Sequence, residues 1–305
     1  MTVNKDEQQT WVYHNVSANG LSFRVAVAGS GDRLLLCLHG FPESALSWRH
    51  QLAPLAHAGY RVWAPDLRGY AGTSKPDGIE AYHLDQLLDD VTALINHAQA
   101  RQVILVGHDW GGVIAWYYAM RHAARIDGLI ILNAPHPACF EREIRRWRQL
   151  RRSWYMLAGQ IPRLPEWILT AKQARLIGVI FDIMRAHPDS IPDHIVRCYR
   201  QQAAEPGALT AMINYYRAAI LGGGARRQRR LGYPTVRLPT LVIWGLHDQA
   251  LTRHNLDGLD GFVMDLTIIP FPHAGHFVHE DDPQRVTDDM LCWLSDRFPR
   301  ASSPS

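Results

Sequence analysis

Short apolar runs that alternate with helical patterns restrict the possible folds of this chain more than any other feature of its sequence. Strands are predicted at 22–29, 34–39, 61–66, 103–107 and 129–135, with helices at 44–57, 85–100 and 111–122. Parallel strands need a long crossover connection, which is usually a helix. The alternation therefore predicts an α/β protein with a mostly parallel central sheet flanked by helices on both faces.

The alternation stops after the fifth predicted strand, and only helical patterns follow until about residue 232. Strand patterns then return at 240–245 and 266–271, and a last helix follows them. We therefore expect a core domain of residues 1–136 and 233–305 and an inserted helical lid (cap) domain of residues 137–232. Because ligands bind beyond the carboxyl ends of parallel strands, a lid inserted there would enclose the site.

Charge is unevenly distributed along the 305 residues, although the net charge is only +3. Residues 138–230 contain 17 lysines and arginines against 7 acidic residues, including the runs RRWRQLRR (145–152) and RRQRR (226–230). A nucleic-acid surface is one interpretation of these runs. The first run falls on the polar side of an amphipathic helix, so we favour a solvated face and expect no nucleic-acid partner. A preference of this basic lid for anionic substrates stays open.

The cysteines and the chain ends favour a reduced, cytoplasmic compartment. The four cysteines are scattered without CxxC spacing, so zinc has no support and Cys37, inside LLLCLH, is expected to be a buried thiol. The first ten residues are polar and lack the apolar run of a signal peptide. No apolar run approaches the roughly 18 residues of a membrane span. The tail, residues 301–305, is expected to be frayed.

The stretch VILVGHDWGG (103–112) predicts a strand, a sharp turn and a helix, with Asp109 at the turn. This is the pattern of a nucleophile elbow, in which a reactive side chain stands at the carboxyl edge of the sheet. An acid before a helix is often only an N-cap. A plain cap does not need Gly107, Gly111 and Gly112, so we favour a reactive role for Asp109.

Two further residues follow predicted strands in the order expected of a nucleophile–acid–histidine triad. Asp248 lies in GLHDQAL after strand 240–245, and His276 lies in PFPHAGHF after strand 266–271. Alone, Asp248 could be a turn residue and His276 could be a surface histidine, since the chain has 16 histidines. Their joint occurrence at strand ends favours a triad with Asp109. For the neighbouring His108, and for His279 and Glu280, we expect packing roles.

A fourth element is the turn HGFPES (39–44) after strand 34–39. The backbone N–H of Phe41 in this turn and that of Trp110 in the elbow are predicted to form a two-donor oxyanion hole. A simple strand-to-helix turn is the alternative.

Two tyrosines of the lid fall on predicted inward faces when residues are spaced at about 100°. In ALTAMINYYRAAI, Tyr216 shares a stripe with Leu209, Met212, Ile213 and Ile220. In the segment from Phe140, the inward face is predicted to hold Phe140, Ile144, Trp147, Leu150 and Trp154. Tyr155 falls about 20° from Ile144. On periodicity alone, both tyrosines are more often core aromatics than reactive groups.

Taken together, these motifs resemble the epoxide hydrolase branch of the α/β-hydrolase fold, from about Trp11 to Phe298. The matching stretches are HGFPES, GHDWGG, NAPHP (133–137), SWYMLAGQIP (153–162), NYYR (214–217), the loop with Asp248 and AGHF with His276. The resemblance implies a catalytic triad of Asp109, Asp248 and His276, with Tyr155 and Tyr216 activating an epoxide oxygen. It implies an epoxide and water as reactants, with no cofactor and no metal. The Trp- and Leu-rich lid favours a small apolar epoxide. The sequence does not decide whether the protein forms a homo-oligomer.

The carboxylate at the elbow fits this chemistry. A carboxylate is already ionised near neutral pH, and the N-terminus of the following helix favours its charge. Asp109 can therefore attack an sp3 carbon directly and form an ester. His276, oriented by Asp248, would then activate the water that hydrolyses this ester to give a vicinal diol.

Two other functions remain as alternatives. Haloalkane dehalogenases share the aspartate nucleophile but resemble HGNP at the first turn, where this chain has Phe41; fluoroacetate dehalogenases resemble DRGG, where this chain has Trp110. A non-catalytic binding protein with a hydrolase fold would not need the triad, the oxyanion turn and the tyrosine pair together.

Overall fold

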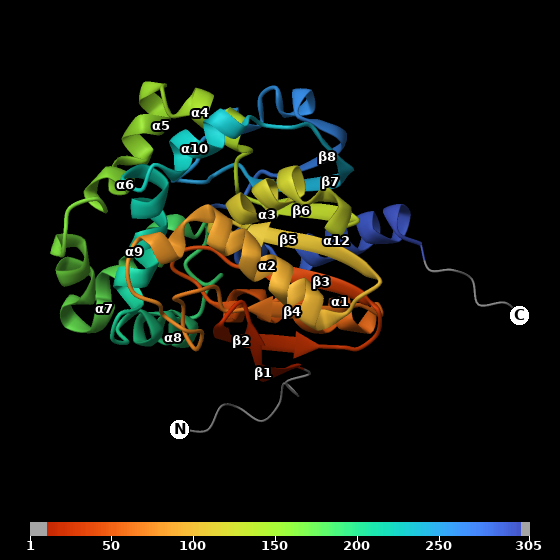
Figure 1. The fold of residues 1–305 in the computed structure, drawn as a ribbon, viewed down its shortest axis with the longest axis horizontal. Coiled ribbons are helices and arrows are strands. Elements are labelled where there is room, and N and C mark those ends of the chain that lie inside the picture. The colour runs from red at the N-terminus through yellow and green to blue at the C-terminus, as the bar shows by residue number, and fades with distance from the viewer. Residues whose placement is uncertain (1–10, 300–305) are drawn as a thin grey trace, which may run out of the picture.

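The computed structural model describes residues 11–299 and contains one sheet of eight strands in the order β1-β2-β4-β3-β5-β6-β7-β8 (Figure 1). Strands β3 to β8 pair in parallel, whereas β1 and β2 form an antiparallel hairpin that joins β4 at the edge. The strands are β1 (Trp11–Ala18), β2 (Leu21–Ala28), β3 (Arg33–Leu38), β4 (Arg61–Pro65), β5 (Gln102–His108), β6 (Gly128–Leu132), β7 (Val236–Gly245) and β8 (Val263–Phe271). The mostly parallel sheet predicted from the sequence is confirmed.

Several features of the sheet differ from the prediction. Strands β7 and β8 begin at Val236 and Val263, earlier than predicted. Strand β1 was not predicted, because WVYHNVSA is exposed at most of its positions and lacks a strong apolar pattern. Strand β6 ends at Leu132 rather than at 135, since Asn133 has a φ of 37° and turns the chain out of the sheet.

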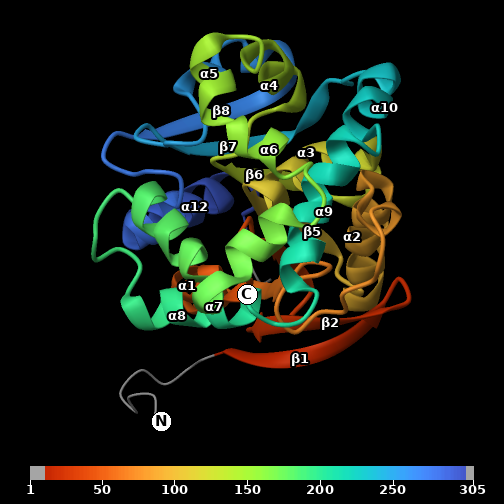
Figure 2. The ribbon, with the colours of Figure 1, turned by 90° about the vertical axis from the view of Figure 1, so that its left-hand side faces the viewer.

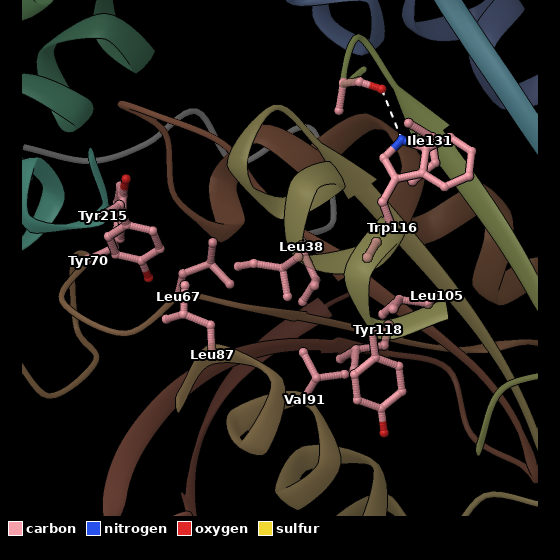
Figure 3. Packing of buried hydrophobic residues seen from close by; sticks show 14 of the residues in the cluster. Leu38, Leu67, Tyr70, Leu87, Val91, Leu105, Trp116, Tyr118, Ile131 and Tyr215 are labelled. Carbon is pink, nitrogen blue, oxygen red and sulfur yellow. Dashed lines mark hydrogen bonds between the residues drawn. The ribbon is translucent and has the colours of Figure 1, made fainter. Parts of the chain in front are cut away.

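Helices cover both faces of the sheet. One face packs against α1 (Arg49–His57) and α12 (Pro283–Arg297). The short helix α11 (Val278–Asp281) directly precedes α12 in the chain. The other packs against α2 (Leu84–Ala98) and α3 (Trp110–Arg121). Figure 3 shows this second core, where the sheet residues Leu38 and Leu105 lie beside side chains of the two helices, namely Leu87, Val91, Trp116 and Tyr118. This core places the start of α3 at the carboxyl edge of the sheet.

Between β6 and β7 the chain forms helices only, as the sequence predicts, and we refer to residues 137–232 as the cap segment. Its helices lie along one side of the sheet (Figure 2). They are α4 (Pro137–Glu143), α5 (Trp147–Arg152), α6 (Trp154–Ala158), α7 (Leu164–Met184), α8 (Asp193–Ala203), α9 (Ala208–Ile220) and α10 (Gly224–Leu231).

The structure also bears on the predictions for the cysteines and for membrane spans. Cys37 is buried, as predicted, and all four cysteines are free thiols. Among residues 11–299, none of the helices is both long and apolar enough to cross a bilayer. The polar N-terminal stretch and the tail of 301–305 lie outside the described residues.

Candidate active site

The turn between β5 and α3 places Asp109 at the carboxyl edge of the sheet, with φ of 46° and ψ of −117°. The glycines around it allow close packing: a Cβ on Gly111 would lie 2.2 Å from the carbonyl oxygen of Leu38, and one on Gly107 would lie 2.4 Å from the carbonyl oxygen of Gly111. The Asp109 side chain makes no capping hydrogen bond to α3. The N-cap alternative is therefore wrong, and a strained backbone of this kind is typical of functional sites.

The Asp109 carboxylate has two distinct oxygens. Its Oδ2 accepts a 2.9 Å hydrogen bond from the backbone N–H of Phe41, in the turn after β3. Its Oδ1 lies 3.7 Å from Nε2 of His276. One oxygen is therefore held by a backbone donor, and the other faces an imidazole.

His276 lies in the loop after β8 and is buried. Its Nδ1 is 2.8 Å from Oδ2 of Asp248. Because the Asp248 carboxylate accepts this hydrogen bond, Nδ1 carries the hydrogen and Nε2 points toward Asp109. The structure thus brings together the three residues that the sequence predicts as a triad.

Asp248 is buried in the loop after β7, and hydrogen bonds compensate its charge. Oδ1 accepts from the backbone N–H groups of Ala250 and Leu251, at 2.7 and 2.9 Å. Oδ2 accepts from the side-chain amide of Asn133 at 2.7 Å, in addition to His276. These four donors keep the carboxylate ionised inside the protein.

Burial and charge oppose each other in this pair. Burial raises the pKa of Asp248, but the His276 charge and the hydrogen bonds outweigh it, so the pKa of Asp248 lies below its usual value. Burial lowers the pKa of His276, but the carboxylates of Asp248 and Asp109 outweigh it and raise that pKa to about 9. The imidazolium is therefore stabilised in the free enzyme.

A cavity of about 360 Å³ lies above Asp109, between the sheet edge and the cap segment. Tyr155 and Tyr216 both line it, and their ring centroids are 5.9 Å apart in an edge-to-face arrangement. Burial and the negative charge of Asp109 raise the pKa of both phenols. Both are therefore protonated at neutral pH and available as hydrogen-bond donors.

Tyr215 differs from Tyr216 although the two are adjacent. Its hydroxyl donates a 2.8 Å hydrogen bond to the carbonyl oxygen of Arg68, and its ring packs against Tyr70 and Trp110. Helix α9 is buried on nearly all sides, so the predicted stripe alone does not separate these two tyrosines.

The predicted inward face of residues 140–154 is correct for Phe140 and Ile144, which line the cavity, and wrong for the other three residues. The segment forms three short helices rather than one, and Trp147, Leu150 and Trp154 are exposed. The buried side chain of α5 is that of Gln149. Each break between helices rotates the inward face, so a single helical period cannot describe it. Tyr155 reaches the cavity because it follows the break at residue 153.

Two buried polar residues tie the site together and were missed by sequence reasoning. Asn133 also accepts a 2.8 Å hydrogen bond from the Gly245 N–H, which joins the ends of β6 and β7. Gln149 joins the cap segment to the loop after β7: it donates to the carbonyl oxygen of Ala250 at 2.8 Å and accepts from the Thr252 N–H at 3.0 Å. The only sequence signal for Asn133 was its position in the NAPHP motif. Gln149 had no sequence signal that could have identified it.

A buried polar cluster lies beneath the site. Glu43 is 2.8 Å from Nδ1 of His108 and 3.3 Å from Nε2 of His279, and His108 Nε2 is 2.9 Å from the carbonyl oxygen of His276. Burial raises the pKa of Glu43, but the two histidines outweigh it and hold that pKa well below its usual value. In a tetrahedral zinc site, neighbouring ligand atoms lie about 3.3 Å apart. The 2.8 Å contact between Glu43 and His108 is shorter than this, so it is a hydrogen bond. The cluster supports the backbone of His276.

The α/β hydrolase fold family model matches residues 33–283 of this chain. Epoxide hydrolase 3 of Xenopus tropicalis is 33% identical over 298 residues, covering 94% of this chain and 78% of that protein. Epoxide hydrolase A of Mycobacterium tuberculosis is 30% identical over 316 residues, covering 92% of this chain and 96% of that protein. The crystal structure of Bacillus megaterium epoxide hydrolase in complex with an inhibitor matches with a TM-score of 0.84 and 29% identity, covering 92% of this chain and all of that one.

These relatives and the fold agree with the resemblance seen in the motifs. The chain belongs to the epoxide hydrolase family of the α/β-hydrolase fold.

Proposed function

We propose that this protein is an epoxide hydrolase that opens an epoxide to a vicinal diol through an ester with Asp109. The observation that carries this proposal is the Asp109 carboxylate, which lies in one cavity with two protonated phenols and 3.7 Å from the His276 imidazole. A nucleophile and two acids thereby line one space the size of a small substrate, and a base lies next to the nucleophile.

In the first half-reaction, Oδ1 of Asp109 attacks a carbon of the epoxide ring and the C–O bond breaks. Tyr155 and Tyr216 donate hydrogen bonds to the epoxide oxygen, because an alkoxide is a poor leaving group without them. Oδ2 stays with the Phe41 N–H and becomes the carbonyl oxygen of the ester.

In the second half-reaction, His276 removes a proton from water, which attacks the carbonyl carbon of the ester. The negative charge develops on Oδ2, where the Phe41 N–H already points and where we assign the Trp110 N–H as second donor. Asp248 stabilises the imidazolium that forms. The C–O bond between the Asp109 carbonyl carbon and the diol then breaks, and the diol oxygen takes the proton of the added hydroxyl. The imidazolium returns its proton, through the phenols, to the oxygen of the opened ring, and the Asp109 carboxylate is restored.

The lining of the cavity favours a small, apolar and uncharged epoxide. Apart from Asp109, its charged lining residues are Glu141 and Arg229, which form an ion pair of 2.7 Å with each other. The remaining lining is largely aromatic and aliphatic, including Trp110 and Phe140. In this proposal the cap domain, residues 137–232, sets the substrate range.

A dehalogenase is disfavoured by the turn after β3. Phe41 packs edge to face on Tyr216, with ring centroids 5.8 Å apart, and places an aromatic ring where a side-chain amide would bind a halide.

The ester can be tested directly. His276→Gln should allow the first half-reaction and block the second, so incubation with styrene oxide should add the mass of one epoxide to the peptide that holds Asp109. Asp109→Asn in the same background is the matched control and should stay unmodified. A His276→Gln protein that remains unmodified, while the wild type forms diol, would rule out the ester. If bromoalkanes release halide and no epoxide gives diol, the dehalogenase is correct.

A further inference from the structure

The cap segment carries an unusual amount of exposed apolar surface. Of the seventeen large hydrophobic side chains that are exposed among the described residues, eleven lie between 147 and 183. Trp147 and Trp167 are each 73% exposed, and Trp154 is 65% exposed. Single exposed apolar side chains are normal, but concentration on one part of the surface marks an interaction site.

Ten of these eleven side chains belong to α5, α6 and α7, and Ile161 lies in the loop between α6 and α7. In both views α5, α6 and α7 follow one another along the side that carries the cap segment (Figures 1 and 2). Near its C-terminal end, α7 buries Ile177 and Phe181 and exposes Val179 and Ile183. A helix that is apolar on both sides is normally covered on both. We name the exposed apolar side chains of residues 147–183 the cap patch.

The charges around the cap patch are mostly positive. Residues 147–183 contain six lysines and arginines and two acidic residues, Glu166 and Asp182. Asp182 is paired with Arg185. Glu166 is already paired with Arg217 from α9. Arg148, Arg151 and Arg163 are exposed among the apolar side chains. A covering partner must therefore be apolar inside and negatively charged at its surface.

We propose that the cap patch binds the surface of anionic phospholipid membranes. Exposed tryptophan and leucine side chains enter the boundary between headgroups and acyl chains, while the arginines contact anionic headgroups. A second copy of the chain fits less well, because a two-fold interface would bring the same cations face to face. This proposal concerns binding only and does not depend on the reaction at Asp109.

Flotation of the full-length protein with phospholipid vesicles tests the proposal. We expect binding to phosphatidylcholine vesicles that contain phosphatidylglycerol to exceed binding to phosphatidylcholine alone by about tenfold or more, and to weaken at high salt. The double variant Trp147→Ser/Trp167→Ser should lose this binding and keep its fold. Met264→Ser, at a 66% exposed position of β8, is the matched control and should bind like the wild type.

Three outcomes would overturn the proposal. Equal or no binding to both kinds of vesicle would remove the anionic membrane as partner. If Arg148→Glu/Arg151→Glu loses binding while the double tryptophan variant keeps it, the protein adsorbs to the vesicles by charge alone. A dimer that becomes monomeric when Trp147 and Trp167 are replaced would assign the cap patch to a second copy. Epoxide turnover, measured in parallel, reports on the proposed reaction separately.

Discussion

The side-chain amide of Asn133 donates a 2.7 Å hydrogen bond to Oδ2 of Asp248, the same oxygen that faces the His276 imidazole. We expect Asn133→Ala to lower kcat by roughly ten- to a hundredfold, because a hydrogen bond to a buried charge is worth about 1.5–3 kcal/mol. The effect should fall on hydrolysis of the ester, where His276 acts. Single-turnover measurements separate this step from alkylation, and equal slowing of both would contradict the assignment.

Gln149 connects the cap segment to the loop that carries Asp248, and its side chain is fully buried. Gln149→Leu should lower the free energy of unfolding by about 2–4 kcal/mol, because it leaves the Ala250 carbonyl and the Thr252 N–H without partners. Urea unfolding measures this change. Gln149→Met removes the same hydrogen bonds but matches glutamine in length, so it should cost nearly as much; a much smaller loss than for Gln149→Leu would assign the effect to packing instead of the hydrogen bonds.

The elevated pKa of His276 predicts the pH dependence of catalysis. His276 must be neutral to activate water, so hydrolysis of the ester should speed up as pH rises. Esterification removes the charge of Asp109, so the apparent pKa of this step should lie below the value of about 9 in the free enzyme. Ester decay in stopped-flow experiments across pH gives this pKa, and a value above 9 would contradict the proposed geometry.

The pair of His276 and Asp248 also links folding stability to pH. The pKa of His276 is raised in the folded state, so its charge contributes stability that is fully present below about pH 6.5 and is lost as pH rises to about 9. Urea unfolding at several pH values should show this loss for the wild type. Asp248→Asn removes the main favourable charge and should abolish this pH dependence; an unchanged slope in that variant would assign the effect to other groups.

The two phenols of the cavity should act on the first half-reaction. Tyr155→Phe and Tyr216→Phe should each slow alkylation of Asp109, and the double variant should slow it by about a hundredfold or more, because no donor then remains for the epoxide oxygen. Tyr215→Phe is the matched control, since the Tyr215 hydroxyl donates to Arg68 instead. Slowing confined to ester hydrolysis would place the tyrosines in a different role.

Residues close to regular strands could be predicted from the sequence. Asp109, Asp248 and His276 each follow a parallel strand, and parallel strands bring their carboxyl ends to one edge. The elbow was further identified by its glycines, because only glycine allows the contact between Gly111 and Leu38. These constraints are local, and a single sequence records them.

Residues that depend on packing between distant segments could not be predicted in this way. Gln149 is buried only because α5 rotates after a helix break and docks on the loop after β7. Glu43 meets His279 across more than two hundred positions of the chain. A periodicity read within one helix contains no information about such contacts.

The adjacency of β6 and β7 has an evolutionary consequence. The cap segment leaves the sheet after one strand and returns to its immediate neighbour, with Leu132 paired to Ile243. Its two junctions therefore sit side by side, and insertions or exchanges within it leave every strand register intact. The part of the cavity lining that the cap segment supplies can thus change in descendants of this gene while Asp109, Asp248 and His276 stay in place at the sheet edge.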